Sequence, residues 1–408
     1  ASNNTAVGYQ ALVVNTTGPS NTAIGMNAMA ANTTGNTNTA VGQGALAANT
    51  VGDNNTALGN DALASFNPSS NADTHNTAVG SQAGAAVTTG LRNTLIGGLA
   101  GDAITTANDN VAVGKGALTA DTTGASNTAV GSAALEVSTT GSENTAVGYA
   151  ALNANTTPIN NTAVGSSALT SNTTGAGNTA LGKGAGLSCT TATELTAIGS
   201  TAGDAVTTGP GNTLIGSRAG VHDVGLTTGP YNTVVGSYSN TSAVDSSHQI
   251  VLGHNVTGNA DSSLCFGTGT TDSAIAFGAT TITAPSDVRL KEDIQDEEVG
   301  LGFINDLRPV TFQWKKEKDI PEEMKAHVAG SEKRTMNGKH NHGFIAQEVK
   351  AVIDNHNMKD GFDMWTEDDS DGRQRLGDAS LMPIMVKALQ ELSAKNDALE
   401  ARLTTLEG

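Results

Sequence analysis

The first 253 residues repeat a short pattern of polar and apolar positions. Each unit reads Asn-Thr-Ala-Val-Gly, then two variable residues, Ala-Leu, two more variable residues and Asn-Thr-Thr-Gly. The glycine after Val marks the unit, and successive marker glycines lie 17 residues apart almost throughout. The step is 21 from Gly59 to Gly80 and 20 from Gly216 to Gly236. A fixed period of this kind predicts a repeat architecture, whatever the local propensities are.

One such unit predicts one coil of a β-solenoid. It is too short for a pair of packed helices, and its Gly and Asn residues disfavour a helix. Thr-Ala-Val predicts a three-residue strand, as in Thr22–Ile24 and Thr162–Val164. A second short strand is predicted over Ala-Leu, as in Ala45–Leu46 and Ala168–Leu169, and Thr-Thr-Gly supplies a turn. Fifteen coils stacked about 4.8 Å apart span roughly 70 Å.

Stacked coils place equivalent residues in columns. The aliphatic residue before each marker glycine is predicted to form an inward column: Val7, Ile24, Val41, Leu58, Val79, Ile96, Val113 and Val130. A second inward column is predicted for Leu12, Met29, Leu46, Leu63, Leu118 and Leu135. The Asn that opens each unit is predicted to form a buried amide ladder that lapses at Leu195 and Gln249; its members are Asn4, Asn21, Asn38, Asn55, Asn76, Asn93, Asn110, Asn127, Asn144, Asn161 and Asn178. Such a core is thin for a free-standing domain, so association of several chains is expected.

The N-T-A-V-G core resembles the head repeats of trimeric autotransporter adhesins over about 250 residues. The resemblance implies a mainly β fold for residues 1–253, namely a left-handed parallel β-roll of 17-residue coils shared by three chains. Residues 254–285 lose the period and are predicted to form a β transition or stem that ends at Pro285. Because the chain begins at Ala1 in mid-repeat, it is expected to be a fragment.

Charge divides the chain sharply at the same place. Residues 1–285 hold 4 of the 21 Lys and Arg residues and 14 of the 39 Asp and Glu residues, and residues 286–408 hold the rest. Both parts are acidic, which argues against a nucleic-acid partner because no basic stripe is available for phosphates. No run of 18 apolar residues occurs, so no membrane insertion is predicted.

The C-terminal residues 381–408 predict a coiled-coil helix. Heptad a positions fall on Met382, Leu389, Asn396 and Leu403, and d positions fall on Met385, Leu392, Leu399 and Leu406. Asn396 is the polar a residue that fixes register. The spacing alone does not decide between two and three chains.

At the boundary between the two parts stands the motif S-D-x-R-L-K-x-x-I, formed by Ser286, Asp287, Arg289, Leu290, Lys291 and Ile294. Three further landmarks follow in order: Leu307–Pro309, His342–Val349 and Leu381–Leu392. Together they resemble the intramolecular chaperone domain at the C-terminus of phage tail spikes and endosialidases, peptidase family S74. The resemblance implies an α+β chaperone domain over residues 286–380 that ends in a trimeric coiled coil.

The resemblance also implies a self-cleavage reaction. Ser286 would act as nucleophile and Lys291 as base, and the chain would be cut between Pro285 and Ser286. The chemistry is reasonable, because a serine hydroxyl needs a base and a lysine serves as one when burial lowers its pKa. The reaction would be a single turnover, so no activity on an external substrate is expected. An inert helix start, with Ser286 as N-cap, is the alternative.

These features predict a homotrimeric fibre of a virion that attaches to a host-surface glycan. A cellular trimeric surface adhesin is the alternative from the β-roll, and a fibre with a glycan-depolymerase domain upstream of Ala1 is a third possibility. Cys189 and Cys265 show no metal-ligand spacing, and the histidines His340, His342 and His356 suggest a metal but define no ligand geometry. No metal and no cofactor are therefore predicted.

Overall fold

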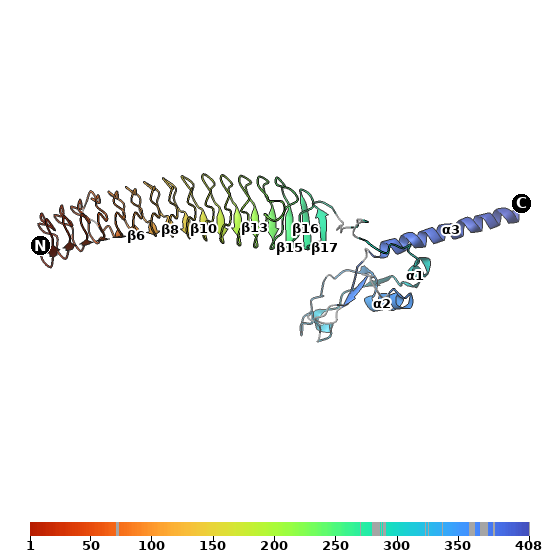
Figure 1. Ribbon diagram of the computed structural model, residues 1–408. Coiled ribbons are helices and arrows are strands. Elements are labelled where there is room, and N and C mark those ends of the chain that lie inside the picture. The colour runs from red at the N-terminus through yellow and green to blue at the C-terminus, as the bar shows by residue number, and fades with distance from the viewer. Residues whose placement is uncertain are drawn as a thin grey trace. The chain divides into compact units, whose positions relative to one another are not determined.

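The computed structural model divides the chain into two compact units, Ala1–Ser286 and Asp287–Gly408. The first unit is a stack of coils, and the second combines short helices and strands with one long C-terminal helix (Figure 1). The structure describes residues 1–70, 73–269, 271–279, 286, 288, 291–322, 324, 326–336, 338–358, 364–367, 374–377 and 380–407.

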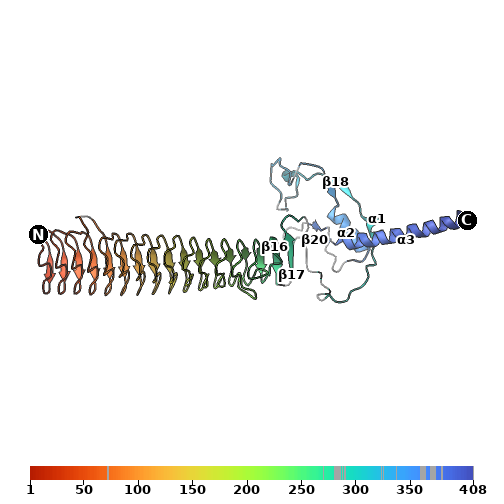
Figure 2. The same ribbon diagram turned by 90° about the horizontal axis from the view of Figure 1, so that it is seen from above.

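The strands of the first unit form one sheet along the stack (Figure 2). Strands β1 to β16 pair in chain order and in parallel, and β17 closes the sheet by pairing antiparallel to β16. Equivalent residues pair between coils, so that Thr145 lies opposite Thr162 and Ala146 opposite Ala163. The parallel β-solenoid is thus confirmed. The strands are β1 (Thr5–Val7), β2 (Thr22–Ile24), β3 (Thr39–Val41), β4 (Thr56–Leu58), β5 (Thr77–Val79), β6 (Thr94–Ile96), β7 (Val111–Val113), β8 (Thr128–Val130), β9 (Thr145–Val147), β10 (Thr162–Val164), β11 (Thr179–Leu181), β12 (Thr196–Ile198), β13 (Thr213–Ile215), β14 (Thr233–Val235), β15 (Ile250–His254), β16 (Ser263–Thr268) and β17 (Thr271–Ala276).

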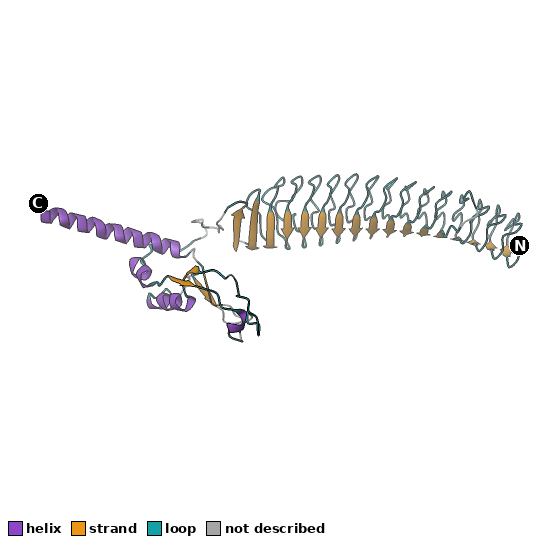
Figure 3. Ribbon diagram, turned by 180° about the vertical axis from the view of Figure 1, so that it is seen from behind, coloured by secondary structure: helices purple, strands orange, loops and turns teal. Residues whose placement is uncertain are grey.

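The second strand predicted in each coil is wrong. The Ala-Leu segments are turns, and strands occupy one side of the stack while turns form the rest (Figure 3). The leucines lie in the left-handed region, with φ of 51° at Leu46 and 49° at Leu169. Their backbone N–H groups still bond the next coil, since that of Leu46 donates to the carbonyl of Ala62 at 3.0 Å. Coil-to-coil bonding therefore persists without extended dihedrals.

The aliphatic residues before the marker glycines face outward, and the prediction that they form an inward column is also wrong. Side chains alternate along a strand, and the buried positions are the opening Asn and the central Ala. The third strand residue therefore lies on the other face. We call the exposed or half-buried residues at this position the outer aliphatic column: Val7, Ile24, Val41, Leu58, Val79, Ile96, Val113, Val130, Val147, Val164, Leu181, Ile198, Ile215, Val235, Leu252 and Phe266.

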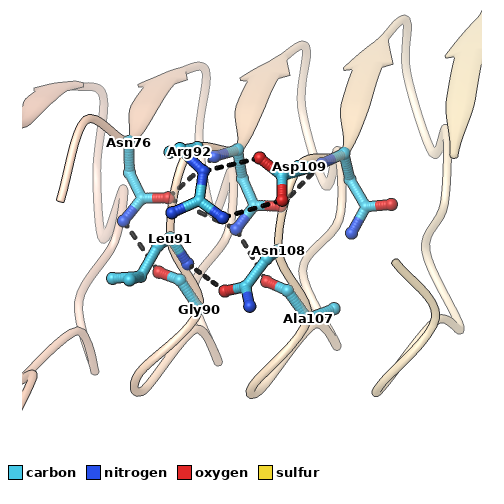
Figure 4. Close-up of polar contacts among 9 residues, drawn as sticks. Asn76, Gly90, Leu91, Arg92, Ala107, Asn108 and Asp109 are labelled. Atoms are coloured by element: carbon cyan, nitrogen blue, oxygen red, sulfur yellow. Dashed lines mark hydrogen bonds and ion pairs between the residues drawn. The ribbon is translucent and has the colours of Figure 1, made fainter. Parts of the chain in front are cut away.

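The predicted leucine column is confirmed as core, and the amide ladder is confirmed with a difference in its bonds. In most coils the side-chain oxygen of each opening Asn accepts the backbone N–H of the opening residue in the next coil, as from Asn93 to Asn76 at 3.0 Å. The Asn76 amide nitrogen donates to the carbonyl of Gly90 at 2.9 Å (Figure 4). Bonds between the side chains themselves are longer here, at 3.3 Å. Each Asn thus satisfies buried backbone groups that would otherwise stay unpaired.

The core keeps its volume by exchanging large and small residues between positions. The strand centre is Ala in most coils but is Leu95 in one and Leu214 in another, both fully buried. Near Leu95 the turn position that usually holds Leu is glycine, and a Cβ at Gly84 or Gly101 would lie 2.6 or 2.8 Å from a Leu95 methyl group. A Cβ at Gly203 would meet Leu214 in the same way, at 2.8 Å. The larger strand residue thus fills the space that the missing turn side chain leaves.

We expect Gly131→Ala to destabilise the solenoid by about 4 kcal/mol or more. Gly131 has φ of +139°, and a Cβ there would lie 2.4 Å from the carbonyl oxygen of Gly148, which is backbone and cannot turn away. Gly269→Ala is the matched control, because Gly269 also has positive φ, +55°, but has nothing within 4 Å of its Cβ position. The control should cost about 1 kcal/mol in thermal or urea unfolding. Equal losses for the two variants would remove the packing explanation.

Asp121 is a buried acid at a position that is polar in some coils and apolar in others. Asn32, Asn49 and Asn172 occupy it in three of the other coils, and the two coils next to Asp121 have Ile104 and Ser138 there. One Asp121 oxygen accepts the N–H of Gly124 at 2.8 Å. Burial raises the pKa of the Asp121 carboxyl to about 7, although its hydrogen bonds act in the opposite direction. The acid form, which is close in shape to Asn, is therefore the one that this position favours.

We expect Asp121 to make the solenoid less stable as the pH rises from about 4 to about 7. Its carboxyl ionises near 3.9 when unfolded but holds its proton to about 7 when folded, so stability falls by roughly 1.4 kcal/mol per pH unit and levels off above 7. Asp121→Asn should remove this loss, matching the native chain near pH 4 and exceeding it at pH 8. Thermal unfolding across this range, with the exposed Asp245→Asn as control, measures the difference. An unchanged pH dependence in Asp121→Asn would contradict the assignment.

The second unit packs three helices around a small core. Its helices are α1 (Leu301–Asp306), α2 (Ala346–Asn355) and α3 (Leu381–Glu407), with a 3-10 turn at Glu317–Asp319. Two antiparallel strand pairs join β18 (Val310–Phe312) with β19 (Asn341–Gly343) and β20 (Trp365–Glu367) with β21 (Gln374–Leu376). The core residues are Phe303, Leu307, Val349, Ile353, Met364 and Ile384. In the part of the chain that the structure describes, no helix has both the length and the apolar character to cross a membrane.

Candidate functional site

The predicted cleavage residues lie at the boundary between the two units. Ser286 is the last residue of the first unit and Lys291 belongs to the second, and both are exposed. The backbone N–H of Lys291 donates to the carbonyl of Val288 at 3.2 Å. Pro285, and with it the bond predicted to be cut, lies outside the described residues. The pairing of Ser286 with Lys291 as nucleophile and base therefore stays a prediction.

An ion pair brings two of the sequence landmarks of the second unit together. The Arg308 guanidinium follows α1 and donates to both carboxylate oxygens of Glu348 in α2, with 2.9 Å between Nε and Oε2. The bidentate geometry fixes the orientation of both side chains, and the hydrogen bond from Arg308 lowers the pKa of Glu348. Both groups are largely exposed, so their contribution to stability is small. Both residues belong to the motifs noted in the sequence, but the motifs did not predict their contact.

Helix α1 is tied to the two other helices by polar contacts as well as by the core. The Glu391 carboxylate in α3 accepts the first helical N–H of α1, that of Leu301, at 3.0 Å. This contact supplies the cap that α1 lacks from its own sequence, where Gly300 stands at the N-cap. On the other side, His356 at the end of α2 contacts Asp306 at 2.8 Å and packs edge-on against Phe303. Residues far apart in sequence thus hold α1 against both neighbours.

A charged cluster fixes the loop after β18. Lys316 and Lys318 both bind the Glu332 carboxylate, at 2.5 Å from Lys316, and hydrogen bonds from the two ammonium groups lower the pKa of Glu332 to about 2. The neighbouring Arg334 donates to the carbonyl of Trp314 at 2.6 Å. The ion pairs of Glu332 with the two lysines, together with the contact of Arg334 with the Trp314 backbone, hold this irregular segment in its conformation.

The long helix α3 exposes most of its heptad apolar residues. Only its start contributes to the core, through Ile384 and Ala388. The predicted a and d residues beyond that point face solvent in the single chain, with Leu389 at 63 % and Leu406 at 82 % exposure. Asn396 bonds within its own helix, donating to Glu400 at 3.1 Å. A seam of this kind is the surface that a coiled coil would bury.

In the described parts of both units, no group of three or more His, Cys, Asp or Glu side chains is placed to bind a metal ion. His342 lies in β19 and His340 just before it, where His340 contacts Gln313 at 3.4 Å. Cys189 and Cys265 are buried free thiols, and burial raises the pKa of each. A buried thiol with a raised pKa is a poor nucleophile.

Comparison with known proteins finds a family match in the second unit. Residues 286–358 match the peptidase S74 family, described as the chaperone of endosialidase. The match begins at Ser286 and covers α1, β18, β19 and α2. No curated protein and no solved structure matches the chain.

Proposed function

We propose that this protein, a long β-solenoid whose C-terminal unit belongs to the endosialidase-chaperone family, is a fibre that its own C-terminal domain assembles and then releases. The observation that carries the proposal is the position of the family match, which starts at the residue where the charge-poor solenoid ends. A domain joined at that point is able to act on the solenoid and then be separated from it by a single cut.

The release step would be a cut between Pro285 and Ser286. Ser286 Oγ attacks the Pro285 carbonyl carbon while Lys291 Nζ takes its proton. The C–N bond breaks as the Ser286 nitrogen gains a proton, which leaves an ester between the two residues. Water then hydrolyses the ester to the Pro285 carboxylate and the free Ser286 hydroxyl. A lysine becomes a base near neutral pH when it is removed from water, and Lys291 is exposed in the single chain. Assembly that buries Lys291 would thus time the cut.

The assembled state would be a homotrimer. The exposed heptad residues of α3 support association, because a helix with this seam is stable when other helices cover it. Three chains rather than two follows from the resemblance to trimeric fibre proteins. Bringing chains together through α3 offsets the entropy of aligning the solenoids, whose pairing is otherwise slow and non-local.

The mature fibre would attach to a host-surface glycan, as part of a virion or of another extracellular fibre. Outside the outer aliphatic column its surface is mostly polar and carries few charges, with 18 charged residues among the first 285. The adhesin-like repeats favour a second candidate, a cellular surface adhesin. Antibodies against the solenoid distinguish the two candidates, because they would label purified virions in the first case and the cell envelope in the second.

Mass measurements test the assembly and release roles together. The intact mass of the purified chain shows whether it is cut after Pro285, and its native mass shows how many chains associate. A cut trimer is the expected result. An uncut single chain under all conditions would overturn both roles.

A further inference from the structure

Four successive coils carry a polar side chain at one buried position, three residues after the leucine of the Ala-Leu turn. These side chains are fully buried, and we call them the inner polar column: Asp121, Ser138, Asn155 and Asn172. Ile104 and Cys189, also fully buried, occupy the same position in the coils on either side. Polar groups enclosed in this way must find their hydrogen bonds inside the solenoid.

A regular Asn at this position donates two hydrogen bonds through its side-chain amide. Asn172 Nδ2 donates to the Oδ1 of Asn155 in the preceding coil at 3.0 Å, and to the carbonyl of Gly175 in its own coil at 2.8 Å. Asn32 donates in the same two directions, at 3.2 and 3.0 Å. Each amide in this position therefore depends on an acceptor supplied by the coil before it.

Asn155 is the exception in this pattern. Its Nδ2 is buried and has no hydrogen-bond partner among the described residues. The amide orientation is fixed, because its Oδ1 accepts the Nδ2 of Asn172 at 3.0 Å and the Nδ2 of Asn161 at 3.3 Å. A flipped amide would set its own N–H groups against those of both neighbours. With Oδ1 facing Asn172, the Nδ2 is turned toward the preceding coil, where Ser138 stands.

Ser138 is too short to meet this amide. Its hydroxyl is also buried without a partner in the part of the chain that the structure describes. The coils do not close up around it, because backbone hydrogen bonds beside the column hold their spacing. The N–H of Thr122 donates to the carbonyl of Thr139, and that of Thr139 to Thr156, both at 2.9 Å. Two unpaired polar groups in adjacent buried positions are costly, which points to a third group that bonds both.

We propose that one water molecule is built into the solenoid at the level of Ser138, in the place of the amide that Asn supplies in other coils. The amide that Ser lacks is close in size to one water, which takes roughly 30 Å³ in the liquid. The water would accept the N–H of Asn155 and the O–H of Ser138. It would then act as the missing acceptor of the column.

Two further groups at this level complete the hydrogen bonds of the water. The carbonyl of Gly175 accepts two amides, those of Asn172 and Asn161, whereas the described contacts give the carbonyl of Gly141 only the amide of Asn127, at 2.7 Å. Gly141 also lies beside Ser138, since a Cβ on it would be 3.3 Å from Ser138 Oγ. The water would donate to this carbonyl.

The fourth hydrogen bond joins the water to the Asp121 carboxyl of the preceding coil. This group accepts the bond when it is ionised and donates it when it is protonated. A buried water with three or four polar partners is the usual kind in proteins.

The groups around the site identify its occupant as water rather than an ion. A cation takes oxygen ligands, but Asn155 presents an N–H group. An anion would face the Gly141 carbonyl and the Asp121 carboxyl, and would remain an unpaired buried charge. Water both donates and accepts, so it satisfies all four groups at once.

A crystal structure of the purified protein, at a resolution that shows ordered waters, tests the site directly. We expect one peak in every copy of the chain, about 2.7–3.2 Å from Asn155 Nδ2, Ser138 Oγ and the Gly141 oxygen. A direct bond from Asn155 Nδ2 to Ser138 or Pro158, with no peak between them, would overturn the proposal. Contacts to oxygen at about 2.4 Å would also overturn it, since they mark a metal ion.

Variants of Ser138 test the same site in solution. Ser138→Asn should displace the water and take over its hydrogen bonds, so the peak should vanish and the midpoint of thermal unfolding should rise by about 2–4 °C. Ser138→Ala removes one partner of the water and should lower the midpoint by about 2–4 °C. The matched control is Ser132→Asn, at an exposed position that Asn60 holds in another coil, and it should leave the midpoint within about 1 °C. A peak that persists in Ser138→Asn, or a lower midpoint for that variant, would contradict the proposal.

Discussion

Ser286→Ala is expected to leave the chain whole, while the unaltered protein yields two fragments, one that ends at Pro285 and one that begins at Ser286. The change removes the proposed nucleophile and leaves no group that attacks the Pro285 carbonyl, so cleavage should fall by a factor of about 10³ or more. Intact mass spectrometry of the purified proteins measures the outcome directly. Native mass should be the same for the two trimers before the C-terminal fragment dissociates.

Variants of Lys291 test whether this residue acts as a base or only supplies a positive charge. Lys291→Ala and Lys291→Arg should both remain uncut, because arginine keeps the charge but does not give up its proton. Cleavage in Lys291→Arg would show that a positive charge suffices and would remove the general-base role. An uncut but fully assembled trimer of the unaltered chain would remove the peptidase role altogether and leave the C-terminal unit as a permanent assembly domain.

Deletion of the second unit is expected to have the other large effect. Residues 1–285 alone should accumulate as aggregates, with native trimer reduced at least tenfold, because the outer aliphatic column is exposed before the chains are aligned. Expression followed by native mass and sedimentation measures the loss. A normal yield of trimer from residues 1–285 would show that the solenoid aligns itself and would contradict the chaperone role.

A refolding experiment tests the same chaperone role in the full-length protein. The cut fibre and the uncut Ser286→Ala trimer have the same solenoid, but only the second keeps its assembly domain attached. After denaturation the uncut trimer should recover and the cut fibre should not, so the stability of the cut fibre is kinetic. Equal recovery of the two would mean that the domain is not needed once the chain has been made.

The sequence predicted the coil period and the Thr-Ala-Val strands well, because both depend on local features that repeat, but it wrongly added a second strand in each coil. It failed on the direction of the outer aliphatic column. Hydrophobicity pointed inward, yet the alternation of a strand and the buried opening Asn already excluded this, since residues one and four of a strand lie on opposite faces. The burial of Asn21 and the exposure of Ile24 therefore follow from one rule.

The sequence pattern could not predict the turn conformations of the solenoid or the contacts within the second unit. A leucine with positive φ, such as Leu46, runs against its intrinsic preference, and stacking on neighbouring coils overrides that preference. The contact of Arg308 with Glu348 joins residues 40 positions apart, and nothing in their local sequence marks them as partners. The proposed dyad is the opposite case, since a motif names Ser286 and Lys291 while their mutual geometry stays a prediction.

The amide ladder and the pairing of equivalent residues repeat from coil to coil along the stack, so no single contact fixes the number of coils in the solenoid. Each coil bonds only the coils next to it, so removal of one 17-residue unit would rejoin Thr to Thr, Ala to Ala and Asn to Asn. The stack would shorten by about 4.8 Å and keep every kind of contact that it had. Loss or gain of whole repeats in the gene would therefore change the length of the solenoid in whole coils, without a new fold to be selected each time. The coils of 20 and 21 residues show that single units also absorb insertions within such a stack.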